Sequence, residues 1–443
     1  MPDKNITEQT VSTLIDALIN DIKDARKRTL ALVDGLDQQQ IIGPQLDIVN
    51  PLLWEIGHVA YFYELWTLRY LDKKDSFLSN ADKLYDSINI AHKDRWSLPL
   101  LSLLETKAYM QQVLDAVIAR LQNDTVNAQD IYLTRYAVFH EDMHTEAFTY
   151  SRRTLNYPAP VFANNVLEDN AYNAGALDGD ADIAGGDFML GAPDDHSGKT
   201  GFCFDNEKWQ HPVNIKAFSI ARAATTYQQY AEFVNDGGYN SQQFWDDEGW
   251  DWLQNNNIKT ANGWKKDTHG NWLIKHFDQW QTMRPHAAVV HVSWYEASAW
   301  CRWAGRRLPT EAEWELAASG SPANNDEKRI YPWGNEKPAE RHVNMNSRAM
   351  RSIDVAALPD GDSAFGCRQM LGNVWEWTAD TFNPYPGFKA DMYQDYSQPL
   401  FGQTKVLRGG AWATRSRMIR NTWRNYYAAD RNDVFAGFRT CAL

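Results

Sequence analysis

The segment His140-Glu141-Asp142-Met143-His144-Thr145-Glu146 lies within a long stretch of helical periodicity. Histidines spaced i, i+4 project from one face of an α-helix, about 6 Å apart along its axis. This face is predicted to be buried, because it is flanked by Tyr136, Ala137, Ala147 and Phe148. Burying two imidazoles together requires partners for both. Two interpretations remain open: the pair binds a metal ion, or both rings are core histidines that bond backbone or carboxylate groups.

A third histidine, His58, lies on an earlier predicted helix. Asn50-Pro51 predicts an N-cap followed by a first-turn proline, and the helix should run to about Tyr70. Alone, His58 would be assigned to the core. Beside the pair it can complete a three-histidine site between helices, where bundles commonly hold metals. Three neutral ligands leave coordination positions open, which is typical of a catalytic ion.

Composition limits the class of protein. The chain has 443 residues, 44% of them hydrophobic, which suits two or three domains with sizeable cores. A net charge of −13 argues against nucleic acid and against an anionic membrane as partners. Four widely spaced cysteines and a polar start without an apolar leader predict a soluble, reduced, cytoplasmic protein. The oligomeric state stays open.

The composition and the hydrophobic periodicity of the sequence change near residue 160. Before it, helical periodicity covers about 8–35, 51–71, 98–124 and 128–155, which predicts a four-helix bundle. After it, Gly, Trp and Asn are frequent and apolar runs are short, with helices expected at Trp294–Trp303 and Pro309–Ala318. The predicted class is therefore α+β, with domains at 1–160 and 175–443.

The second half carries an ordered set of motifs: Gly185–Gly191, Phe204–Glu207, Gly305–Glu315, Gly372–Trp377, Leu407–Trp412 and Gly437–Arg439. Over about 180–443 these resemble the formylglycine-generating (sulfatase-modifying factor) fold, which is related to C-type lectins. Those enzymes hold copper with a cysteine pair in the last fifty residues. Here Cys441 is the only cysteine in that region, so we do not expect this activity, because copper(I) prefers thiolates.

Together, the two halves resemble the ergothioneine-type sulfoxide synthases, EgtB-like non-haem iron enzymes with a DinB-like bundle in front. The resemblance implies that His58, His140 and His144 hold Fe(II). It also implies that Glu146, in the pattern H-x-x-x-H-x-E, supports the ligands without binding the metal itself. Such enzymes couple a thiol to the imidazole of hercynine (trimethyl-histidine) with O2 as oxidant. The residues alone do not separate iron from zinc or nickel, since imidazole suits all three.

The same resemblance implies substrate contacts in the second domain. Tyr393 matches a tyrosine that donates a proton to the reduced oxygen, and Tyr396 one that orients substrate. Asn425 and Tyr426 match positions that hold hercynine, and an aromatic wall suits its quaternary ammonium. Arg431 matches a residue that binds the carboxylate of the thiol. The alternatives are packing roles for the tyrosines and, for Arg431, an ion pair with a neighbouring aspartate.

Two departures from that family leave the sulfur or selenium donor open. Tyr427 stands where γ-glutamylcysteine users carry an acid, and Met143 where they carry glutamine. The segment around Arg95-Trp96 resembles the selenoneine-synthase branch, which joins a selenosugar to hercynine, and its aromatics suit a sugar. The sequence therefore favours the selenosugar by a small margin over a cysteine-containing thiol, although the segment could also be a structural loop between helices.

Two other classes of function remain open from the sequence. The DinB-like bundle also occurs in metal-dependent thiol S-transferases, and the lectin-like domain can bind ligands without catalysis. The stretch Asn344-Met345-Asn346 is, in addition, a candidate for a structural Ca²⁺ site.

Overall fold

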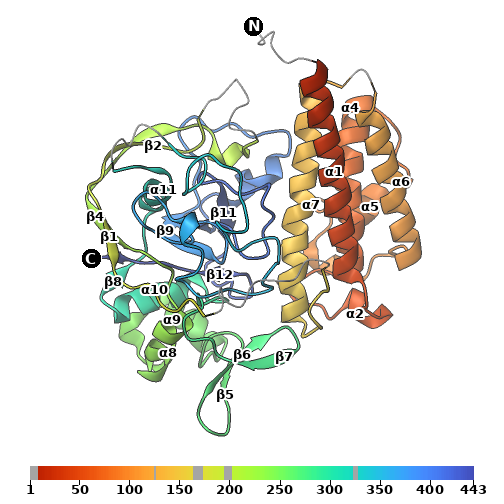
Figure 1. Ribbon diagram of the computed structural model, residues 1–443. Helices are drawn as coiled ribbons and strands as arrows, with labels where there is room; N and C mark the ends of the chain where they lie inside the picture. The colour runs from red at the N-terminus through yellow and green to blue at the C-terminus, as the bar shows by residue number, and fades with distance from the viewer. Residues whose placement is uncertain (1–7, 124–125, 163–172, 194–201, 323–327) are drawn as a thin grey trace. The chain divides into compact units, whose positions relative to one another are not determined.

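The computed structural model describes residues 8–123, 126–162, 173–193, 202–322 and 328–443. The chain divides into two compact units, Met1–Ala163 and Asn164–Leu443 (Figure 1). The first is helical and the second combines short strands with helices, which confirms the predicted α+β class. Within the described residues, no helix is both long and apolar enough to span a membrane.

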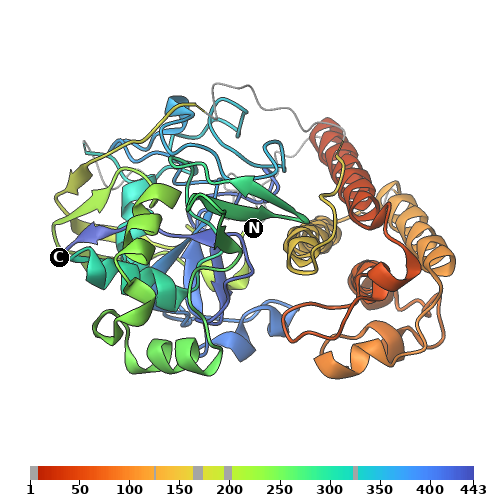
Figure 2. The same ribbon diagram turned by 90° about the horizontal axis from the view of Figure 1, so that it is seen from below.

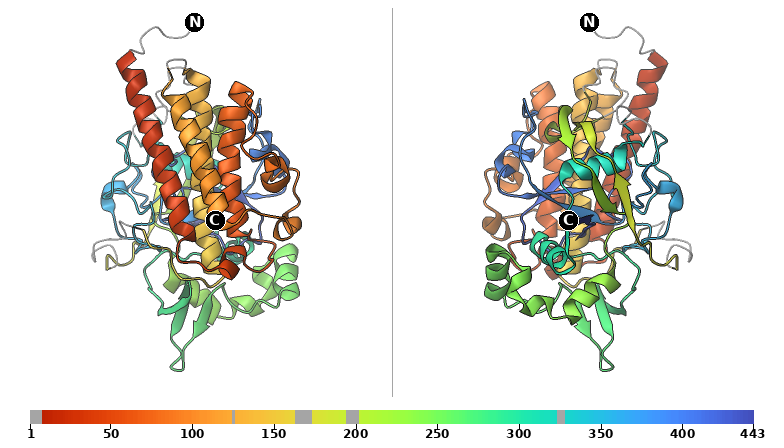
Figure 3. Two further views of the ribbon diagram at one scale, coloured as in Figure 1. Left: turned by 90° about the vertical axis from the view of Figure 1, so that its right-hand side faces the viewer. Right: turned by 90° about the vertical axis from the view of Figure 1, so that its left-hand side faces the viewer.

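The first unit is built on four long helices: α1 (Glu8–Val33), α3 (Leu52–Tyr63), α6 (Leu103–Leu121) and α7 (Ala128–Thr154). Helix α1 packs against α7, and α3 packs against both α6 and α7. Figure 2 shows α3 and α7 nearly end-on, and the left view of Figure 3 shows the long helices of this unit running in roughly the same direction. Capping boxes begin two of the helices: Ser102 with Glu105 for α6, and Asn127 with Asp130 for α7.

Helix α3 differs from the prediction at its start. It begins at Leu52, its N-cap residue is Pro51, and the cap has no side-chain hydrogen bond. The Asn50 side chain instead donates to Glu55 Oε1 over 2.5 Å. The helical path continues through the π-helix η1 (Glu64–Arg69) and α4 (Tyr70–Asp72), close to the predicted end. Such π segments occur often at functional sites.

A buried ion pair joins α1 to α7. Arg26 Nε donates to Glu141 Oε1 over 2.9 Å, and the two side chains are 4% and 0% exposed. Thr29 Oγ1 donates to the same carboxylate oxygen over 2.7 Å, while Arg26 Nη1 donates to the Met110 carbonyl over 2.7 Å. Glu141 therefore holds the helix turn that carries His140 against its neighbour.

Three further short helices belong to the first unit: α2 (Gln38–Ile42), α5 (Ala81–Tyr85) and the 3₁₀ helix η2 (His92–Trp96). Helix α5 packs against α3. Gly57 allows this packing, because a Cβ there would lie 2.2 Å from Cε1 of Tyr85. The end of α5 is thereby brought directly beside His58.

The second unit contains four small sheets, ordered β1-β4-β13-β8, β11-β10-β9-β12, β2-β3 and β5-β6-β7. Their strands are β1 (Asp180–Ile183), β2 (Gly186–Leu190), β3 (His211–Ile215), β4 (Phe218–Ala221), β5 (Trp264–Lys266), β6 (Trp272–His276), β7 (Gln279–Thr282), β8 (Arg306–Arg307), β9 (Trp375–Thr381), β10 (Lys405–Arg408), β11 (Arg424–Tyr427), β12 (Ala436–Gly437) and β13 (Cys441–Ala442). The helices are α8 (Tyr227–Asn235), α9 (Asp247–Asn255), α10 (Trp294–Trp303) and α11 (Glu311–Ser319). The last two match the predicted helices, and α11 starts later because Thr310 caps it.

Buried ion pairs hold the second core together. Arg408 bonds Glu311 over 2.7 Å and also pairs with Glu315, and Arg424 bonds Glu311 over 2.6 Å. Arg439, from the closing motif, bonds Glu376 over 2.6 Å. These contacts give the ordered motifs of this half a structural role.

Candidate metal centre

Three histidine side chains converge inside the first unit. His58 comes from α3, and His140 and His144 come from α7. One ring nitrogen of each lies within 4.8 Å of the others, and the Nε2 atoms of His140 and His144 are 3.2 Å apart. An ion bound at about 2.1 Å to each nitrogen needs ligand separations of roughly 3 to 3.5 Å. The His140–His144 pair already has this spacing, and with His58 the three imidazoles form a candidate site for a single ion.

Hydrogen bonds fix which nitrogen of two rings faces the centre. His58 Nδ1 lies 2.8 Å from the Tyr85 carbonyl, which can only accept, so this nitrogen carries the proton. His144 Nδ1 likewise donates to Glu55 Oε2 over 2.6 Å. The Nε2 lone pairs of both rings are left for the metal. Metal-binding histidines are commonly held in this way by a carbonyl or carboxylate.

The environment favours the neutral form of two of the ligands, His58 and His140. Burial, followed by the nearby His144, lowers the pKa of His58 to about 3. Burial and the other two histidines lower the pKa of His140 well below its usual range. Burial alone would raise the pKa of Glu55, but the charge and hydrogen bond of His144 outweigh it and the net shift is downward. Neutral imidazoles beside a carboxylate are the protonation states that bind metal.

An aromatic ring stacks on each of two ligands. Trp54 stacks on His58 with centroids 4.8 Å apart, and Phe62 stacks on His140 at 3.6 Å, both nearly parallel at 8°. His58 and His140 are 3% and 4% exposed, whereas the His144 side chain is 21% exposed. His144 is therefore the most exposed of the three histidines.

Glu55 is the carboxylate that the sequence analysis missed. It lies 89 positions before His144, but it is the one charged residue of the otherwise apolar helix α3 and stands three places before His58. That spacing puts both on the same face and could have revealed it. Glu146 is also buried, at 7% exposure, but it lies about 200° around α7 from His144. Met143, next to His144, is half-buried.

Replacing Glu55 should weaken metal binding without removing a ligand. We expect Glu55→Ala to lower Fe(II) affinity by about 10- to 100-fold, because His144 loses the bond that orients its ring and raises its basicity. Glu55→Gln keeps an acceptor and should lose less. Anaerobic competition titration measures both, with the exposed Glu232→Ala as the control. Equal affinities in all three variants would show that the contact is unimportant for binding.

Arg95 and Trp96 lie on η2 and make contacts within the first unit. The Trp96 indole donates to the Gly43 carbonyl over 3.2 Å. Arg95 Nη1 donates to Asn50 Oδ1 over 2.8 Å, and its guanidinium lies 4.0 Å from the centroid of the Trp54 ring. Asn50, which also bonds Glu55, is therefore the single residue that links Arg95 to the Glu55 carboxylate.

The candidate tyrosines of the second unit form one cluster. Tyr393 precedes the 3₁₀ helix η8 (Gln394–Tyr396) and is half-buried, while Tyr396 is buried. The Tyr426 hydroxyl donates to the Tyr396 carbonyl, and the two rings meet edge-on at 5.9 Å. Burial, then Tyr396, Asp205 and Tyr393, raise the pKa of Tyr426 well above its usual value. Asn425 is next to Tyr426 on β11, so the two side chains point to opposite faces of the strand.

Comparison with known proteins covers both units. The model of the sulfatase-modifying factor enzyme 1-like domain matches residues 169–442, and that of the DinB superfamily matches 21–147. The chain is 35% identical to the "Hercynine oxygenase" of Mycobacterium tuberculosis, over 94% of this chain and 96% of that protein. The chain belongs to the hercynine oxygenase family. A second hercynine oxygenase, from Mycolicibacterium thermoresistibile, is 34% identical over 95% of this chain and 94% of its own length.

A relative with a different activity in its name matches only part of the chain. The "Formylglycine-generating enzyme" of Streptomyces coelicolor is 32% identical over 53% of this chain and 78% of that protein. Full-length similarity, together with the histidine triad, identifies the chain as an enzyme of the hercynine oxygenase family with a metal site in its DinB-like half.

Arg431 and Tyr427, two of the predicted substrate contacts, lie close together. Arg431 forms two hydrogen bonds with Asp433, of 2.6 and 2.7 Å, which is the ion pair considered as its alternative role. Its guanidinium also lies 5.3 Å from the centroid of the Tyr427 ring. Any carboxylate that approaches Arg431 therefore competes with Asp433.

The described part of this hercynine oxygenase family member gives no support for calcium. Asn344 donates to the Arg351 carbonyl and to Asn373, both over 3.0 Å, and Asn346 accepts from the Ser416 backbone over 2.9 Å. Among the described residues, the histidine triad is the one group of three or more His, Cys, Asp or Glu side chains close enough to share an ion.

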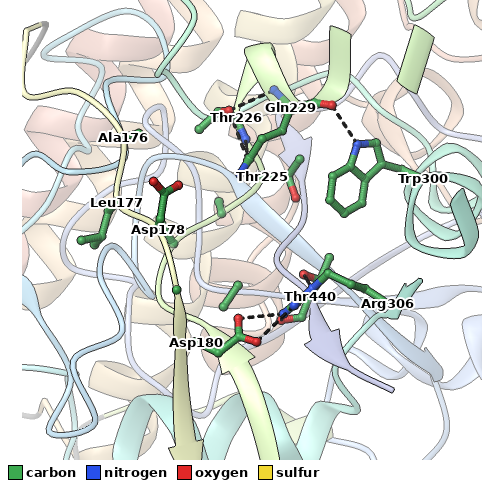
Figure 4. A pocket seen from close by; sticks show the side chains of 14 residues that line it. Ala176, Leu177, Asp178, Asp180, Thr225, Thr226, Gln229, Trp300, Arg306 and Thr440 are labelled. Carbon is green, nitrogen blue, oxygen red and sulfur yellow. Dashed lines mark hydrogen bonds and ion pairs between the residues drawn. The ribbon is translucent and has the colours of Figure 1, made fainter. Parts of the chain in front are cut away.

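A cavity of ≈ 260 Å³ lies elsewhere in the second unit (Figure 4). Arg306 crosses it to bond Asp180 over 2.8 Å and Thr440 over 2.6 Å, and the Trp300 indole donates to the Gln229 carbonyl over 3.2 Å. None of the residues predicted to contact substrate lines this cavity.

Proposed function

We propose that this enzyme uses Fe(II) held by His58, His140 and His144, together with O2, to join the sulfur of a cysteine-containing thiol to the imidazole of hercynine. The observation that carries the proposal is the convergence of three imidazoles, two with fixed tautomers, in a chain related over 94% of its length to a hercynine oxygenase. Bound iron would supply open coordination positions and the redox chemistry that lets O2 act as oxidant.

The residues of the chain have separate tasks in this proposal. Tyr85 and Glu55 hold two ligand rings in place, and the exposed edge of His144 leaves the approach open. We propose that Tyr393 of the second unit is the proton donor to the reduced oxygen, because a tyrosine phenol can act as a general acid. We further propose that Tyr396, Asn425, Tyr426, Tyr427 and Arg431 take part in substrate binding, and that Glu146 supports the ligands on α7.

The proton-donor role of Tyr393 can be tested by removing one oxygen atom. We expect Tyr393→Phe to reduce formation of the coupled product by about 100-fold or more, because general acid catalysis contributes on this scale. Fe(II) affinity should stay at the wild-type value, since Tyr393 is no ligand. Product formation is followed by mass spectrometry, with the exposed Tyr70→Phe as the control. Wild-type turnover in Tyr393→Phe would assign the proton to another donor.

The selenosugar favoured by the sequence finds no support among the relatives, so a thiol is the donor proposed here. The test is incubation of iron-loaded protein with hercynine, air and a panel of thiols and selenols. Mass spectrometry identifies the product while an electrode follows O2. Coupling to a thiol with O2 uptake supports the proposal, and coupling only to a selenol restores the selenium branch. Thiol transfer by zinc- or nickel-loaded protein without O2 uptake would instead support an S-transferase.

A further inference from the structure

A line of hydrogen bonds runs from the 3₁₀ helix η2 to a metal ligand. Arg95 Nη1 donates to Asn50 Oδ1 over 2.8 Å, and Asn50 Nδ2 donates to Glu55 Oε1 over 2.5 Å. The other carboxylate oxygen, Glu55 Oε2, accepts from His144 Nδ1 over 2.6 Å. Three successive contacts therefore connect Arg95 with His144.

Arg95 determines the direction of this line. A guanidinium only donates hydrogen bonds, so Asn50 must turn its oxygen toward Arg95. The amide nitrogen of Asn50 then faces Glu55, where it satisfies one carboxylate oxygen and leaves the other for His144. Without Arg95 the amide could rotate and set its oxygen against the Glu55 carboxylate, which would repel it.

The same guanidinium reaches a second ligand by stacking. It lies 4.0 Å from the centroid of the Trp54 ring, and Trp54 stacks on His58 at 4.8 Å. The Trp54 indole is itself fixed by a bond to the Leu84 carbonyl over 2.7 Å. The next carbonyl along the chain, that of Tyr85, accepts the proton of His58 Nδ1. Arg95 thus contacts the Trp54 ring on which His58 stacks, and through Asn50 it supports the hydrogen bond between Glu55 and His144.

Arg95 also bonds the loop that precedes η2. Its Nη2 donates to the Ser87 carbonyl over 3.3 Å, and the side chain is half-buried. Because the guanidinium is a planar fork of five donors, it can bond an amide, bond a carbonyl and stack on an indole at once. Lysine has no plane and cannot do all three.

We propose that Arg95 is a positioning residue that sets the orientation of His144 and His58 from outside the metal site. The inference rests on the proposed function only in assuming that the triad binds a metal. It changes the assignment of Arg95 from substrate contact to support of the ligands, and it names Asn50 as the link.

Cobalt(II) is the probe, since imidazole ligands bind it and its visible absorption reports on ligand geometry. We expect Arg95→Ala to weaken Co(II) binding by about 10-fold or more and to change the visible spectrum. Arg95→Lys should fall between Arg95→Ala and wild type. Asn50→Leu should also weaken binding, and the double variant should lose less than the product of the single losses, because both act through Glu55. Lys93→Ala is the matched control, since it removes one exposed positive charge from the same 3₁₀ helix.

The inference is overturned if Arg95→Ala keeps the Co(II) affinity and spectrum of Lys93→Ala, above all if its KM for the thiol rises. Strictly multiplicative losses in the double variant would overturn the link through Asn50. Should Arg95→Ala fail to fold, as judged by circular dichroism, Arg95→Lys and Asn50→Leu carry the test, because each preserves part of the contacts. Wild-type protein that binds no Co(II) would refute the proposed metal site itself, an outcome distinct from the others.

Discussion

His140→Ala is expected to abolish iron binding and product formation together. The substitution removes one of three ligands and leaves the Phe62 ring, now stacked at 3.6 Å, facing an empty space. Loss of a ligand should cost more than loss of a residue that merely orients one, so we expect Fe(II) affinity to fall by more than about 100-fold. Anaerobic titration measures the affinity, and O2 uptake with hercynine and thiol measures activity.

Two controls make the result specific. His269→Ala removes an exposed histidine of the second unit and should keep wild-type affinity and O2 uptake. Circular dichroism of His140→Ala checks that the bundle still folds. A folded His140→Ala protein that binds iron as tightly as wild type would refute the three-histidine site.

Arg26→Met is expected to give the largest loss of stability. The substitution leaves the Glu141 carboxylate, 0% exposed, with Thr29 as its remaining described donor. Removing one partner of a buried ion pair typically costs about 3 to 5 kcal/mol, because the other charge stays desolvated. Urea denaturation followed by far-ultraviolet circular dichroism, which reports mainly on helix, should show an earlier transition.

The double variant Arg26→Met with Glu141→Leu separates charge from packing. With both charges replaced by apolar groups of similar size, much of the lost stability should return. If the double variant is as unstable as Arg26→Met alone, the shape of the contact matters and the stranded charge does not.

The sequence predicts the metal ligands better than their supports. His140 and His144 are revealed by helical spacing, whereas His58 becomes a ligand candidate only beside that pair. Helix limits also follow closely, since capping residues such as Thr310 are local signals. Asn50 was predicted to cap α3, but its side chain bonds Glu55 instead. The Asn50 oxygen that would cap the helix accepts from Arg95, 45 positions away, and a local cap motif cannot show such a competitor.

The supports of the site depend on contacts between distant segments. Glu55 meets His144 across 89 positions, and Arg95 meets Asn50 across 45. In the second unit, the pairing of Arg431 with Asp433 was one of two open alternatives. Family resemblance assigned Asn425 and Tyr426 to one substrate, whereas the pleat of β11 turns them to opposite faces. Only the folded chain shows such geometry.

The stacking of Trp54 on His58 and of Phe62 on His140 has a consequence for how the enzyme is assembled in the cell. The histidine rings are held by protein groups alone: two aromatic side chains, the Tyr85 carbonyl and the Glu55 carboxylate. Folding can thus be completed before the ion arrives, in contrast to small zinc domains that collapse only around their metal. Metal supply would then govern when the folded molecule becomes active, and the bound ion would add to its stability.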